Sequence, residues 1–105
     1  MAKILLVEDE INIASFIERG LQEFGHEVRV ANDGQAGWEL VRQEDFQLLI
    51  LDIIMPKMNG FDVLSRMARA GWIEDIPVIM ISGEDSDEAV LRAYELGASD
   101  YVSRP

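Results

Sequence analysis

The chain alternates between short continuous apolar runs and longer segments in which apolar residues recur at helical spacing. Continuous apolar runs are typical of strands covered on both faces. The three clearest are KILLV (3–7), QLLIL (47–51) and PVIMI (77–81). EVRVA (27–31) alternates like a strand, and DYVS (100–103) is predicted as a last short one. The pattern therefore predicts five strands spread evenly along the sequence.

A helical pattern separates each strand from the next. The apolar residues of the first predicted helix recur three or four positions apart: Ile11, Ala14, Ile17, Leu21 and Phe24. Gly25 is a natural stop for this helix. Further helices are predicted after an Asn32-Asp33 cap, over residues 61–71, and from the GEDSDE segment to about Leu96.

Strands and helices that alternate in this way, through connections too short for anything but crossovers, predict a parallel sheet with helices on both faces. We expect an α/β fold with a doubly wound sheet, in one domain covering residues 1–105. In such sheets, function is found at the carboxyl ends of the central strands.

Composition narrows the possible functions. The chain is 49% hydrophobic and has no cysteine, so it can bury a core but has no disulfide or thiolate metal site. Its formal net charge of −11 argues against direct binding of nucleic acid, which calls for a basic surface. Neither a signal peptide nor an apolar run long enough to cross a bilayer is present, so we expect a cytoplasmic protein without membrane contact.

Polar side chains follow the predicted strands at the edge where function is expected. The residues at these strand ends are Glu8, Asp9, Asp52, Ser82, Ser103 and Arg104. Acids and serines often cap helices at such junctions, but a cap needs only one polar residue. Carboxylates crowded beside a buried strand repel one another. A hard divalent cation such as Mg²⁺, which prefers oxygen ligands, would allow the carboxylates of Glu8, Asp9 and Asp52 all to stay ionised.

Four segments together resemble the receiver domain of two-component response regulators. They are ILLVEDE (4–10), LLILDIIMPKMNGFDVL (48–64), IPVIMISGED (76–85) and LGASDYVSRP (96–105). The resemblance covers the whole chain in the family's order and spacing, and is closest to receivers that precede a winged-helix DNA-binding domain. It implies a flavodoxin-like five-stranded sheet in the order 2-1-3-4-5.

The resemblance also implies a phosphoacceptor and a metal site. Asp52 matches the aspartate that receives a phosphoryl group from the phosphohistidine of a histidine kinase. Glu8 and Asp9 match the residues that hold Mg²⁺, together with Asp52 and the backbone carbonyl of Ile54.

Four other residues match positions that respond to the phosphoryl group. Ser82 matches the hydroxyl residue that binds a phosphoryl oxygen, and Tyr101 the aromatic that turns inward on activation. Arg104 stands where the family almost always has lysine; it keeps the charge but replaces a compact ammonium with a planar fork. Glu84, like Ile54, matches a position that tunes attack of water on the acyl phosphate.

The implied protein is a switch, not an enzyme with a separate substrate. Its implied partners are a sensor histidine kinase and an output domain absent from this chain, which we expect to bind DNA. Receivers continue with a fifth helix where this chain ends at Pro105. We therefore expect the final helix to be missing, part of an apolar sheet face to be exposed, and the chain to self-associate or swap elements.

Three other functions are alternatives to this one. A dinucleotide or flavin binder usually has a glycine-rich turn between its first strand and first helix, but here that turn is Glu8-Asp9-Glu10. An aspartyl-phosphate phosphatase would want a second acid two residues after Asp52, where Ile54 stands. A receiver-like binding module that does not signal by phosphorylation is the third alternative, which the intact acids disfavour.

Overall fold

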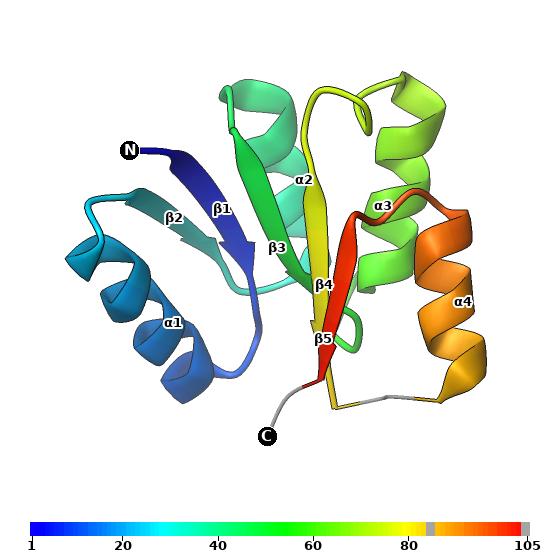
Figure 1. The fold of residues 1–105 in the computed structure, drawn as a ribbon, viewed down its shortest axis with the longest axis horizontal. Coiled ribbons are helices and arrows are strands. Elements are labelled where there is room, and N and C mark those ends of the chain that lie inside the picture. Colours follow the sequence, from blue (N-terminus) through cyan, green and yellow to red (C-terminus); the bar gives the residue numbers. More distant parts are fainter. Residues whose placement is uncertain (84–85, 104–105) are drawn as a thin grey trace.

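Five short strands pair side by side into a parallel sheet in the order β2-β1-β3-β4-β5 (Figure 1). The computed structural model describes residues 1–83 and 86–103. Its strands are β1 (Lys3–Val7), β2 (Glu27–Ala31), β3 (Leu48–Asp52), β4 (Val78–Ser82) and β5 (Asp100–Ser103). Its helices are α1 (Ile11–Glu23), α2 (Gly34–Gln43), α3 (Gly60–Ala70) and α4 (Asp87–Glu95). The doubly wound sheet and the strand order predicted from the sequence are confirmed.

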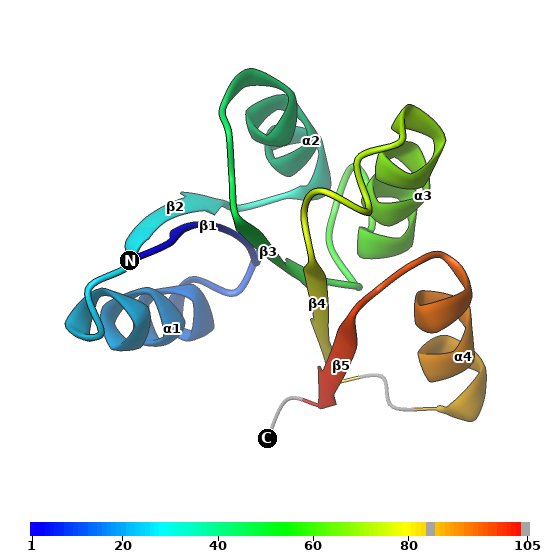
Figure 2. The ribbon, with the colours of Figure 1, turned by 45° about the horizontal axis from the view of Figure 1, so that its top comes forward.

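The sheet separates two apolar clusters, because successive side chains of a strand point to opposite faces. Ile4 and Leu6 of β1 lie in the smaller cluster, against α1. Leu5 and Val7 lie in the larger one, which residues of α2, α3 and α4 complete. Figure 2 shows α1 on one side of the sheet and the other three helices on the opposite side. None of the helices in the described part of the chain has the length and apolarity needed to span a bilayer.

Side-chain caps fix the starts of three helices that follow strand-end loops. Asp33 Oδ1 accepts from the Ala36 amide at 2.8 Å and begins α2. Asn59 Oδ1 accepts from the Asp62 amide at 2.9 Å and begins α3. Ser86 is the cap of α4. Each cap satisfies one of the amides that a helix start leaves unpaired, so the loops before these helices end at defined positions.

Two details differ from the sequence pattern. Asp52 and Ser82 are the last residues of β3 and β4, where the sequence had suggested that they follow the strands. Asp52 stays in the sheet because it pairs with Ile81 in the ladder. Ile11 and Phe24 are 69% and 84% exposed, although their spacing predicted a buried face. They stand at the two ends of α1, beyond the reach of the sheet that covers Ala14.

The face of the sheet that carries α1 is only partly covered. A groove of about 340 Å³ runs between α1 and β5, lined mainly by Ile13, Phe16, Ile17, Ile81 and Val102. Phe16 is 73% exposed and Val102 is 48% exposed. An exposed apolar surface is thus present on the face where it was expected. Association of two copies through it stays a prediction.

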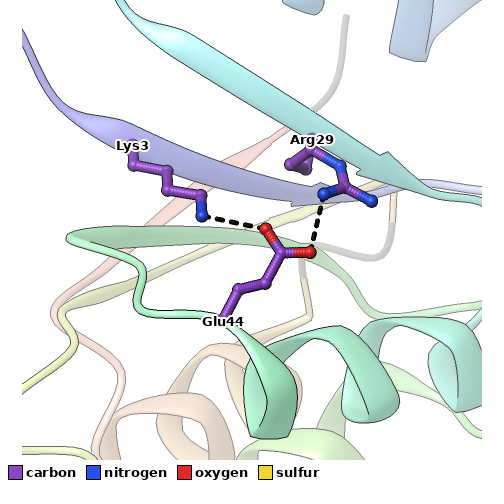
Figure 3. A network of polar contacts seen from close by, with 3 residues as sticks. All are labelled: Lys3, Arg29 and Glu44. Atoms are coloured by element: carbon purple, nitrogen blue, oxygen red, sulfur yellow. Dashed lines mark hydrogen bonds and ion pairs between the residues drawn. The ribbon is translucent and has the colours of Figure 1, made fainter.

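A charged cluster joins three elements at the amino edge of the sheet (Figure 3). The Glu44 carboxylate follows α2 and meets Lys3 Nζ of β1 at 2.8 Å and an Arg29 nitrogen of β2 at 2.6 Å. The hydrogen bond from Lys3, with the charge of Arg29, holds the pKa of Glu44 below its usual value of 4.5. These contacts tie α2 to the first two strands far from the strand ends where function is expected.

We expect Glu44→Gln to lower the free energy of unfolding at pH 7, because the variant loses the charge that Lys3 and Arg29 attract. Because the pKa of Glu44 is lower in the folded state, its ionised carboxylate stabilises the fold at any pH above its unfolded-state pKa. This stabilisation is lost as the pH falls through the folded-state pKa. The two proteins should therefore converge in stability as the pH falls below 4.5, as measured by urea denaturation at a series of pH values. A difference that stays constant with pH would contradict this role for the carboxylate.

Two helical glycines give a matched pair of substitutions. A Cβ at Gly37 of α2 would lie 2.7 Å from Val7 Cγ2 in the buried core, whereas a Cβ at Gly20 of α1 would meet nothing within 4 Å. Alanine improves helix propensity at both sites, by about 1 kcal/mol. Only Gly37→Ala adds overpacking, which costs about 1–3 kcal/mol. The free energy of unfolding from urea denaturation should thus be higher for Gly20→Ala than for Gly37→Ala by about 1–3 kcal/mol. Equal values would refute the close packing of α2 on β1.

Candidate functional site

Three carboxylates meet at the carboxyl edge of the sheet. Glu8 directly follows β1, Asp9 is the next residue, and Asp52 ends β3. The two strands are neighbours, with Val7 opposite Leu51. One oxygen from each of the three carboxylates lies within 4.8 Å of the other two. The fold therefore brings together the acids that the sequence placed 43 residues apart between Asp9 and Asp52.

The three acids differ in burial. Glu8 and Asp52 are fully buried, whereas Asp9 is exposed. Glu8 Oε2 accepts from the Glu10 amide at 3.0 Å, and Asp52 Oδ1 accepts from the Ile53 amide at 2.9 Å. Backbone donors thus fix both buried carboxylates in orientation, while Asp9 lies at the solvent side of the cluster.

This donor set fits a hard divalent cation. It consists of carboxylate oxygens alone, the ligands that Mg²⁺ and Ca²⁺ prefer. Buried carboxylates so close together repel one another, and burial penalises their charged forms. A divalent cation reverses both effects, because its charge attracts each oxygen. The residues that could hold such an ion are therefore Glu8, Asp9 and Asp52.

A buried hydroxyl ends the next strand of the same edge. Ser82 closes β4 and is fully buried. Since Asp52 pairs with Ile81, Ser82 lies one residue further toward the carboxyl edge on the neighbouring strand. Its position is consistent with the role that the sequence assigned to it, contact with a phosphoryl oxygen, and that role stays a prediction.

Two of the other predicted residues, Tyr101 and Ile54, are among those that the structure describes. Tyr101, in β5 opposite Met80, is partly buried and packs against the larger apolar cluster. Ile54 follows Asp52 by two residues in the chain and is 63% exposed. The predicted ligand role of its carbonyl remains untested. Arg104 and Glu84 lie outside the described residues.

The loop after Asp52 contains two features that the sequence did not reveal. Gly60 begins α3 so close to β3 that a Cβ there would lie 2.2 Å from the carbonyl oxygen of Asp52. Lys57 has a φ of 70°, and its Nζ lies 3.6 Å from Asp33 Oδ2 at the start of α2. An Asn-Gly pair such as Asn59-Gly60 is a common turn signal, but it does not predict this close approach. Nothing in the sequence signals the Lys57 contact, because Asp33 is 24 residues away.

Known proteins share both the sequence and the fold. The sequence profile of the response regulator receiver domain matches residues 4–105. The probable transcriptional regulatory protein SilR of Salmonella typhimurium is 36% identical over 103 residues, which are 98% of this chain and 44% of SilR. The chain thus spans less than half the length of this curated relative.

Two solved structures superpose over the whole chain. The receiver domain of a Francisella response regulator gives a TM-score of 0.92 at 30% identity, with 85% of that chain covered. The response regulator protein TrrA of Thermotoga maritima, in complex with Mg²⁺-BeF, gives a TM-score of 0.88 at 28% identity, with 88% covered. At this level of similarity the four-helix, five-strand arrangement of the described residues is shared with both proteins.

Repulsion within the carboxylate cluster leads to a test. In metal-free buffer we expect Asp9→Asn to raise the free energy of unfolding by up to about 1 kcal/mol, the Coulomb energy of two charges at this separation in water. Millimolar Mg²⁺ should stabilise the parent chain more than the variant, because the variant has one ionised ligand fewer. Asp45→Asn removes the same charge at the amino edge of the sheet. Its stability in metal-free buffer and its response to Mg²⁺ should both match those of the parent chain. Identical responses from the two variants would rule out the cluster as the metal site.

Proposed function

Because the chain belongs to the response regulator receiver domain family, we propose that Asp52 accepts a phosphoryl group from the phosphohistidine of a histidine kinase, with Mg²⁺ bound beside it. The observation that carries this proposal is the meeting of Glu8, Asp9 and Asp52 at one edge of the sheet. The complex of the similar TrrA protein with Mg²⁺-BeF supports the same choice of metal.

In phosphoryl transfer the protein mainly positions the reacting groups and supplies positive charge that offsets the negative charge of the phosphoryl oxygens. A carboxylate oxygen of Asp52 forms a bond to phosphorus as the bond from phosphorus to the histidine nitrogen breaks, and an acyl phosphate results. The Ile53 amide, 2.9 Å from Asp52 Oδ1, orients the carboxylate for this attack. A bound Mg²⁺ supplies positive charge to the phosphoryl oxygens. Glu8, Asp9, Asp52 and the carbonyl of Ile54 are the proposed ligands.

Phosphorylation would change the charge of the site and thereby its packing. It replaces one carboxylate charge with about two phosphate charges. Ser82 ends the strand beside Asp52, and we propose that its hydroxyl moves to meet a phosphoryl oxygen. Tyr101, only partly buried on the adjacent strand, would then turn inward into the space that is vacated. Arg104 would pair with the phosphoryl group as the usual lysine does.

We propose that this switch acts on an output domain of a longer protein. SilR, a transcriptional regulatory protein by name, is more than twice the length of the matched region. We propose that this chain controls a DNA-binding output domain in the cytoplasm. With a net charge of −11, the receiver itself is unsuited to contact DNA.

Treatment with a small phosphodonor such as acetyl phosphate tests the acceptor. With Mg²⁺ present, intact mass should increase by one phosphoryl group, and the increase should be lost in Asp52→Asn and without metal. Asp45→Asn, an acid exposed at the opposite edge, should label like the parent chain. Ser82→Ala should label more slowly, because a hydrogen bond to the transferred group is missing.

Labelling that survives in Asp52→Asn would show that another side chain is the acceptor. A chain that binds Mg²⁺ but gains no phosphoryl group would favour the binding-module alternative.

A further inference from the structure

The loop between β3 and α3 is held against the start of α2. The backbone of Gly34 approaches Met58 so closely that a Cβ on Gly34 would lie 1.6 Å from the Met58 carbonyl oxygen. Beside this contact, Lys57 Nζ lies 3.6 Å from Asp33 Oδ2. The tip of the loop therefore has two adjoining contacts with one helix terminus.

Asp33 has a different partner on each of its two carboxylate oxygens. Oδ1 accepts from the Ala36 amide at 2.8 Å and caps α2, while Oδ2 faces Lys57. The cap fixes the orientation of the carboxylate, so Lys57 meets an acceptor that is already in place. The Asp33 side chain is 20% exposed and that of Lys57 is 69% exposed. Asp33, the cap residue before α2, is thus the more buried partner and has a second hydrogen bond, whereas Lys57 reaches it from the loop.

The loop has a backbone geometry that needs such support. Lys57 has a φ of 70°, a left-handed value that costs a residue with a side chain about 1–3 kcal/mol. The Met58 amide donates to the Pro56 carbonyl at 2.8 Å, which closes a three-residue turn around Lys57. The base of the loop is closed as well, because the Gly60 amide donates to the Ile53 carbonyl at 2.8 Å. Strained turns of this kind persist where their surroundings fix them.

We propose that Asp33, through Lys57, is a positioning residue for the metal site, which sets the path of the loop and with it the direction of the Ile54 carbonyl. This inference rests on the proposed function, in which that carbonyl is a ligand of Mg²⁺. The start of α2 acts on the site through the loop, without touching metal or phosphoryl group.

Charge-removing substitutions separate positioning from a simple electrostatic effect on Mg²⁺. Through space, Asp33→Asn would weaken binding of the cation and Lys57→Gln would strengthen it, because the two side chains carry opposite charges. If the pair acts by positioning, both variants weaken binding, and the double variant is no weaker than either single one. Asparagine caps helices as well as aspartate does, so Asp33→Asn leaves α2 intact.

The test uses the 105-residue chain and Mg²⁺ alone, titrated by calorimetry. We expect Asp33→Asn and Lys57→Gln each to weaken Mg²⁺ binding by about twofold to fivefold, the range for an exposed ion pair. Lys57→Arg should restore the parent affinity. In metal-free protein, amide hydrogen exchange in residues 54–58 should be faster in both single variants by a similar factor, with far-UV circular dichroism unchanged.

Opposite signs for the two single variants, or parent-like hydrogen exchange in the loop, would overturn the proposal. Phosphodonor labelling of the parent chain serves as the separate control. If the parent binds Mg²⁺ and is not labelled, the proposed function fails while the loop measurements still decide the positioning role.

Discussion

Repulsion among three carboxylates is the constraint around which this domain is organised. Glu8 and Asp52 are fully buried, and each has an oxygen within 4.8 Å of the others and of Asp9. Such crowding costs free energy that the rest of the fold must offset. The apolar runs of β1 and β3 do so, since their pairing buries side chains on both faces of the sheet. The same pairing fixes the acids where a divalent cation can bind them all.

Close backbone contacts surround the acids because of the path that the loops must take. A loop that leaves a buried strand and returns at once as a helix must pass near the strand's last carbonyl. Gly60 makes that approach possible at Asp52, and Gly34 does the same between α2 and Met58. Any side chain at either position would move the loop away from the site. The chemistry at the strand ends thus depends on glycine packing as much as on the acids.

The fold and the acidic centre could be predicted from sequence because both follow from local periodicity. Continuous apolar runs marked β1, β3 and β4, and parallel topology then brought Glu8, Asp9 and Asp52 to one edge. What could not be predicted depends on contacts between distant segments. The left-handed turn at Lys57 and its pairing with Asp33 have no local signal, because lysine rarely adopts that conformation. The exposure of Ile11 and Phe24 likewise depends on where the sheet ends beneath α1.

Contacts lead away from Asp52 in two directions, to α3 and to β5, and the packing differs between them. Along the first, Gly60 abuts Asp52, and the next residue, Phe61, is only 8% exposed beneath the Arg92 guanidinium of α4, 4.5 Å from its ring. Along the second, Ser82 of β4 leads to β5 and the partly buried Tyr101. A close-packed ring such as Phe61 has little room to move, whereas Tyr101 is less completely buried. The β5 side is therefore the less tightly enclosed of the two, because Phe61 of α3 is held beneath Arg92 of α4.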